Sequence, residues 1–125
     1  MIIKIDVSGE IPIYVQLRNE IVKGIGRGEF ADGEALPTVR QLASELGVNT
    51  MTVSKAYQSL KAEGFIETDR RRGAVVGLPD RGGSCDDRAF CEKLEGELEL
   101  LSAEAKIKGF QKEDFIRLCD AAFEW

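Results

Sequence analysis

Two short helical patterns separated by a very small gap constrain this chain more than any other feature. Thr38 begins a Thr-x-x-Gln capping box, and the apolar residues after it recur at helical spacing as far as Gly47. Asn49 is suited to cap a second helix, because its side chain can accept a hydrogen bond from the first helical turn. Gly47 accepts the left-handed conformation that ends a helix. The sequence therefore predicts helices over residues 38–47 and 50–63, joined by a tight turn as in a helix-turn-helix.

The outer face of the second helix of this pair is the first candidate for a functional surface. Val53, Ala56 and Leu60 form its expected core side. In a helix-turn-helix the second helix enters the DNA major groove, and polar side chains there suit phosphates and base edges. The expected DNA-binding residues on this helix are Asn49, Thr50, Thr52, Lys55 and Tyr57. The alternative is that Asn49 is only a cap and that the others form a solvated face.

The second candidate is an arginine-rich hairpin tip. Residues 65–68 and 74–76 have the composition of two short strands, and residues 70–72 between them are three consecutive arginines. A charge run is usually solvated. This one follows the helix pair at the distance of a wing, so we expect at least one arginine to contact the DNA backbone or the minor groove. Arg40, near the start of the first helix of the pair, is a further candidate, and its alternative role is a surface ion pair with Glu45.

A further helical pattern at the N-terminal side completes this domain. An apolar residue recurs every four positions from Ile13 to Ile25, which predicts a helix over residues 12–28. One helix, the helix pair and a hairpin together make a winged helix-turn-helix. The expected fold is therefore mainly α with a small β-hairpin, and we expect the winged domain to span residues 1–76.

The C-terminal part has a different organisation. Three glycines and one proline mark residues 77–86 as a linker. Two helices are expected over residues 87–108 and 112–123, and the apolar stripe of the first has near-heptad spacing. Such helices can bury their apolar face against a second copy, so residues 87–125 are expected to form a helical dimerisation arm. The expected interface residues are Phe90, Leu94, Leu98, Leu101, Phe115 and Leu118.

Charge and composition exclude several classes of function. The net charge is −5, but residues 1–76 hold ten basic and ten acidic residues, so the deficit lies in residues 77–125 and a basic face remains possible. The chain has no histidine and no Cys-x-x-Cys pair, so we expect no metal site and no cofactor. No phosphate-binding loop or activated nucleophile is visible, so an enzyme is not expected. Without a visible signal peptide or membrane-spanning run, the expected location is the cytoplasm.

Several motifs in residues 12–76 follow one another almost without a gap. They are Pro12-Ile13-Tyr14-x-Gln16-Leu17, Gly28-Glu29-Phe30, Leu36-Pro37-Thr38-Val39-Arg40-Gln41-Leu42-Ala43, Leu46-Gly47-Val48-Asn49, Thr52-Val53-Ser54-Lys55-Ala56-Tyr57 and Glu63-Gly64-Phe65-Ile66. Together they resemble the GntR family of bacterial transcription regulators. The resemblance implies DNA contacts at Arg40, at the five polar residues of the second helix, and at Arg72 and Gly73 in the wing. Arg71 completes the set of expected wing contacts, although the wing lacks the family's first glycine and its hydroxyl residue.

The short C-terminal arm resembles the YtrA-like members of that family, whose arm serves dimerisation. Two helices alone cannot enclose a sizeable effector pocket, and the sequence identifies no small-molecule effector. The expectation is a sequence-specific DNA-binding transcription regulator that binds a palindromic operator as a homodimer. Repression is expected, because a small dimer that occludes a promoter needs no contact with the polymerase. The alternative is a winged module that binds protein, and the salt dependence of duplex binding distinguishes the two.

Overall fold

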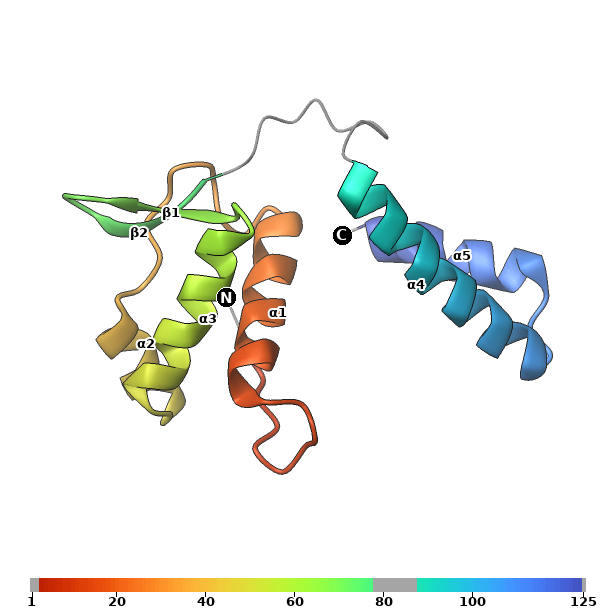
Figure 1. The fold of residues 1–125 in the computed structure, drawn as a ribbon, viewed down its shortest axis with the longest axis horizontal. Helices are drawn as coiled ribbons and strands as arrows, with labels where there is room; N and C mark the ends of the chain where they lie inside the picture. Colours follow the sequence, from red (N-terminus) through yellow and green to blue (C-terminus); the bar gives the residue numbers. More distant parts are fainter. Residues whose placement is uncertain (1–2, 78–87, 125) are drawn as a thin grey trace. The chain divides into compact units, whose positions relative to one another are not determined.

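The structure is a computed structural model that describes residues 3–77 and 88–124, and the chain forms two compact units, Met1–Arg81 and Gly82–Trp125 (Figure 1). The first unit holds α1 (Ile13–Gly26), α2 (Val39–Leu46), α3 (Thr50–Ala62) and the strands β1 (Ile66–Asp69) and β2 (Gly73–Val76). The second holds α4 (Arg88–Ile107) and α5 (Lys112–Phe123). The mainly α fold with a small hairpin is confirmed. The predicted linker, residues 77–86, lies outside the described residues except for Gly77.

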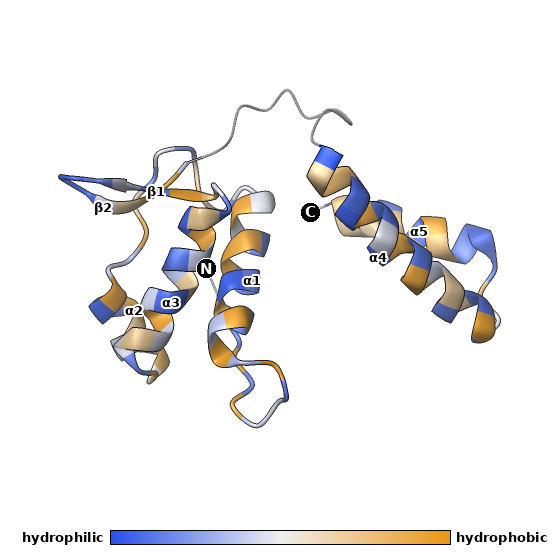
Figure 2. Ribbon diagram, viewed as in Figure 1, coloured by the Kyte–Doolittle hydropathy of each residue, from blue (hydrophilic) through white to orange (hydrophobic). Residues whose placement is uncertain are grey.

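The core of the first unit forms where α1 runs alongside α3 (Figure 1). Both helices are amphipathic, and hydrophobic and hydrophilic segments alternate along their ribbons in Figure 2. Leu17 and Ile21 of α1 are fully buried, as are Val53 and Leu60 of α3. Each such side chain contributes about 1.5–3 kcal/mol relative to an exposed one. The four-residue spacing of the α1 stripe therefore fixes which face of α1 meets α3.

The predicted tight turn between α2 and α3 is present. The Thr38 hydroxyl accepts a hydrogen bond from the Gln41 amide at 3.1 Å, and the Gln41 side chain accepts one from the Thr38 amide at 3.0 Å. Gly47 ends α2 with a φ of 67°, a conformation that side-chain-bearing residues rarely adopt. Asn49 then caps α3 through its side-chain oxygen, which accepts from the Met51 amide at 2.7 Å. These caps hold the start of α3 at a fixed angle to α2.

The hairpin has a neighbour that the sequence did not indicate. β1 and β2 pair antiparallel, with Ile66 opposite Val76. On the other side of β2, Ala35 forms an isolated bridge with Val75, and the Leu36 amide donates to the Ala74 carbonyl at 2.9 Å. The connection between α1 and α2 is thereby hydrogen-bonded to the wing. Strand β2 is therefore hydrogen-bonded along both of its edges, to β1 and to the α1–α2 connection.

The second unit is a pair of amphipathic helices without a buried interior. No residue of α4 or α5 within the described range is buried, and several apolar side chains are largely exposed. These include Phe90, Leu94, Leu101 and Leu118, four of the residues predicted for the dimer interface. In the described parts of the chain, no helix combines the length and the apolar character needed to cross a membrane.

Candidate nucleic-acid interface

The outer face of α3 is built by helical spacing and by the cap at its start. Met51, Lys55 and Gln58 are exposed and lie three or four residues apart, so they share one face of the helix. Val53 and Leu60 hold the opposite face in the core. Asn49 uses its side-chain oxygen as the cap, which leaves its amide N–H groups on the exposed side. The beginning of α3 therefore presents an amide, an ammonium and an apolar thioether to solvent.

Two more of the expected residues lie at this end of α3. Thr50 is exposed and Thr52 is half-buried. Thr52 lines a shallow groove on the α3 surface together with Met51, Lys55 and Tyr14. Both hydroxyls therefore lie near the end of the helix that reaches base edges when such a helix enters a major groove.

Lys55 is held by a contact that the sequence did not reveal. Its Nζ lies 4.1 Å from the centre of the Tyr14 ring, close enough for a cation–π interaction. Tyr14 is in the first turn of α1, so two helices position this ammonium group. The Pro-Ile-Tyr motif at the start of α1 was the only available signal, since nothing in its spacing relates it to Lys55. Tyr14 is thus a positioning residue for the exposed face.

The expectation that Tyr57 lies on the outer face is wrong. Its side chain is only 7% exposed, and its hydroxyl donates a hydrogen bond to the Pro37 carbonyl at 2.7 Å. Tyr57 comes four residues after Val53 and three before Leu60, so the helical repeat itself places it on the core side. Its role is to fix the segment immediately before α2. Burial, with a smaller contribution from the Glu45 charge, raises the pKa of Tyr57 to about 12.

Tyr57→Phe is expected to lower the free energy of unfolding by about 1 kcal/mol at neutral pH, because the Pro37 carbonyl loses its donor. The pKa of Tyr57 is raised in the folded state, so its stabilising contribution is complete below about pH 10 and is lost as the pH rises to about 12. Urea unfolding of both proteins across this range measures the difference. The wild type should lose stability relative to the variant, and parallel curves would contradict a buried, protonated phenol.

The wing tip is shaped by an aspartate. The Asp69 carboxylate accepts hydrogen bonds from the backbone amides of Arg71 at 2.8 Å and Arg72 at 3.2 Å. These two bonds, assisted by the Arg72 charge, hold the pKa of Asp69 below its usual value. Gly73 follows with a φ of 78° and begins β2. The tip itself is strongly hydrophilic (Figure 2).

The three arginines of the tip differ in what they contact. The Arg72 guanidinium donates to the Gly33 carbonyl at 2.7 Å and lies 3.4 Å from the Asp69 carboxylate, so it ties the wing to the α1–α2 connection. Arg70 and Arg71 are exposed. Within residues 3–77 and 88–124, neither of their guanidinium groups has a hydrogen-bond or ion-pair partner. Those two cations are therefore available to an anionic partner.

Arg40 lies in the first turn of α2 and is exposed. The alternative role considered for it, an ion pair with Glu45, does not occur in the described structure. The side chain is therefore free on the α2 surface, two residues beyond the Thr38 cap. The cap and the Tyr57 hydrogen bond to Pro37 both fix the backbone from which Arg40 projects.

These features define a winged helix-turn-helix protein with a polar and cationic face on its second helix. Residues 13–76 match the family described as bacterial regulatory proteins, gntR family, and the chain belongs to this family. The family is described as bacterial regulatory proteins, and several relatives of this chain are named transcriptional regulators or repressors.

Named relatives cover different shares of the chain. An HTH-type transcriptional regulator of Mycobacterium tuberculosis is 38% identical over 74 residues, which are 59% of this chain and 61% of that protein. The chain thus spans about three fifths of that relative. The HTH-type transcriptional repressor YtrA of Bacillus subtilis is 34% identical over 104 residues, which are 83% of this chain and 73% of that protein.

Solved structures resemble both units. A transcriptional antiterminator from Listeria monocytogenes is 25% identical and covers 100% of this chain and 95% of its own, with a TM-score of 0.83. YtrA from Sulfolobus acidocaldarius, a GntR-family transcription factor, is 35% identical, with coverages of 95% and 94% and a TM-score of 0.59. The DNA-binding domain of AraR in complex with operator ORE1 is 25% identical, with coverages of 62% and 94% and a TM-score of 0.52.

Proposed function

We propose that this protein is a sequence-specific transcriptional repressor that binds a palindromic operator as a homodimer. The observation that carries the proposal is the combination, in one unit, of an exposed polar face on α3 with free cations on α2 and at the wing tip. The proposed DNA contacts are Arg40, Asn49, Thr50, Thr52, Lys55, Arg70 and Arg71. Arg72, whose side chain is 55% exposed, and Gly73 also shape the wing and stay proposed wing contacts, whereas Tyr57 acts from within the core.

These residues divide into two kinds of contact. The first turn of a recognition helix reaches base edges, so the proposed readers of the major groove are Thr50, Thr52 and the free amide of Asn49. The wing guanidinium groups are proposed to bind phosphates or the minor groove, contacts that position the protein without reading much sequence. Repression fits such a compact binder, and the Bacillus subtilis relative is named a repressor.

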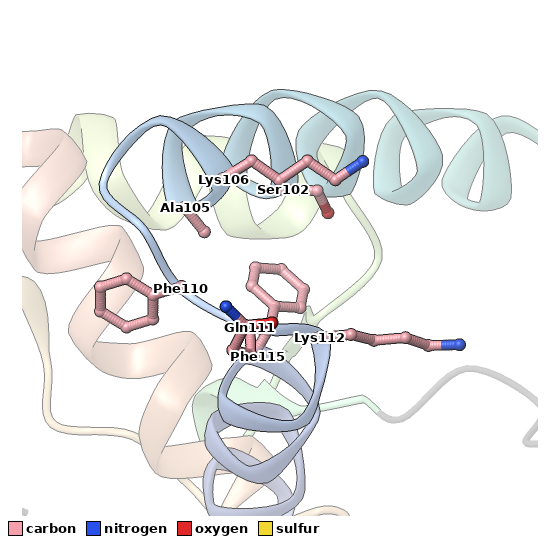
Figure 3. A pocket seen from close by; sticks show the side chains of 7 residues that line it. All are labelled: Ser102, Ala105, Lys106, Phe110, Gln111, Lys112 and Phe115. Atoms are coloured by element: carbon pink, nitrogen blue, oxygen red, sulfur yellow. The ribbon is translucent and has the colours of Figure 1, made fainter.

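The homodimer is proposed to form through the second unit. Within residues 88–124 none of its side chains is buried in one chain, and a second copy would cover the exposed apolar ones. A pocket of about 350 Å³ between α4 and α5 is lined by Ala105, Phe110 and Phe115, among others. In Figure 3 the Phe115 ring points from α5 toward α4, while Phe110 lies apart from it. In this proposal residues 1–76 bind DNA, residues 77–86 link the units and residues 87–125 form the dimer, which acts in the cytoplasm.

The test is a selection of bound sequences from a library of random duplexes, followed by affinity measurements on the selected duplex and on a random one. We expect an inverted repeat to be enriched. Arg40→Ala should then weaken binding to the selected duplex more than to the random one, because a good base contact is worth about 1–3 kcal/mol of discrimination. Lys106→Ala, in the second unit, is the matched loss of charge and should leave the discrimination unchanged.

Two outcomes would contradict the proposal in different ways. If Arg40→Ala weakened both duplexes equally, Arg40 would contact phosphate rather than bases. If no sequence were enriched and duplex binding did not depend on salt, the winged unit would have to bind something other than DNA, such as a protein.

A further inference from the structure

Met51 stands out on the outer face of α3 because it is apolar. It is the second residue of α3, and its side chain is 77% exposed. Across the helices and strands of the described first unit, no other large hydrophobic side chain is exposed to this degree. Single exposed apolar residues are common on protein surfaces and need no explanation by themselves. The position of Met51 does call for one, because the first turn of a recognition helix is the part that contacts base edges.

Helical geometry directs Met51 away from the core. It precedes Val53 by two residues, about 200° around the helix, and so lies almost opposite that fully buried side chain. Asn49 fixes the backbone of this turn, because its side-chain oxygen accepts a hydrogen bond from the Met51 amide itself. Met51 also forms part of the groove that contains Lys55 and Thr52. Its direction is therefore set by the fold, while its unbranched thioether can still adapt to a surface.

We propose that Met51 is a specificity-determining residue that reads the C5-methyl group of one thymine in each half-site. This inference rests on the proposed function, which it deepens by naming a base. In the major groove only thymine presents a methyl group, whereas the other base edges mainly present donors and acceptors. A thioether placed against donors and acceptors would desolvate them without replacing their hydrogen bonds, which is unfavourable. Placed against a methyl group, it removes apolar surface of both partners from water.

The experiment uses the duplex recovered from the random library, with each thymine replaced in turn by deoxyuridine. That replacement removes only the methyl group and keeps every hydrogen-bonding group of the base pair. For the wild-type protein we expect one replacement per half-site to lower the affinity about fourfold, and about 15-fold when both half-sites are changed. For Met51→Ala, which preserves helix propensity, the same replacements should leave the affinity within about twofold.

Gln58→Ala is the matched control, because Gln58 lies on the same face of α3, two turns further along. This variant should show the wild-type loss on deoxyuridine replacement whatever its overall affinity. A duplex in which no thymine is sensitive would overturn the inference and leave the proposed function standing. An equal loss in wild type and Met51→Ala would also overturn it, because another group would then read the methyl. A selection that enriches no sequence would overturn the proposed function and this inference together.

Discussion

Leu101→Asp is expected to convert the protein from a dimer to a monomer and to lower its affinity for an inverted-repeat duplex by about 100-fold or more. Leu101 is 53% exposed within one chain, so a carboxylate there remains solvated in the monomer and should cost little stability. In the proposed dimer it would be buried without a partner, at a cost of several kcal/mol per site. Sedimentation velocity measures the first effect, and duplex binding measures the second.

The neighbouring residue supplies the control. Leu100 is 63% exposed, and its side chain lies about 100° around α4 from that of Leu101, away from the stripe that contains Leu94, Leu98 and Leu101. Leu100→Asp introduces the same charge on the same helix and should leave the protein dimeric. If Leu101→Asp stayed dimeric with full affinity, the dimer would form through the winged unit, and the proposed role of residues 87–125 would be wrong.

Replacing Arg70 and Arg71 together by Ala is expected to weaken binding to every duplex by a similar factor. A dimer would then lose four free guanidinium groups. Each phosphate that is no longer neutralised makes the slope of log affinity against log salt concentration less steep by about 0.9. The slope should therefore fall by up to about 3.6, which corresponds to roughly a thousandfold in affinity at low salt. Titrations of selected and random duplexes at several salt concentrations measure both quantities.

Arg72→Ala provides the contrast, because its guanidinium group binds the Gly33 carbonyl and the Asp69 carboxylate. We expect this variant to change the salt slope less than the double variant does, and to loosen the wing. Faster hydrogen exchange of the Gly33 amide, which donates to the Val76 carbonyl, would report that loosening. If the salt slope of the Arg70 and Arg71 double variant equalled that of the wild type, the wing would not be part of the DNA interface.

Local rules were enough to predict the elements of the winged unit. The capping box at Thr38, the left-handed Gly47 and the Asn49 cap depend only on residues within one turn of each other, so the sequence encodes them directly. The apolar repeat of α1 is equally local. For the same reason the candidate surface on α3 could be predicted, because helical spacing decides which residues lie opposite Val53 and Leu60.

The sequence by itself therefore determined the helices, their caps, the hairpin and the approximate face that we propose to contact DNA. The tertiary structure alone decided how individual side chains are used, because their partners are distant in sequence. Tyr57 contacts Pro37 across twenty positions, and Arg72 contacts Gly33 across thirty-nine. No local pattern specifies such pairs, since each depends on how the α1–α2 connection packs against α3 and the wing. Helical spacing already puts Tyr57 on the core side of α3, but only this packing gives its hydroxyl the Pro37 carbonyl as a partner, joins Arg72 to Gly33, and leaves Arg70 and Arg71 as the free cations of the tip.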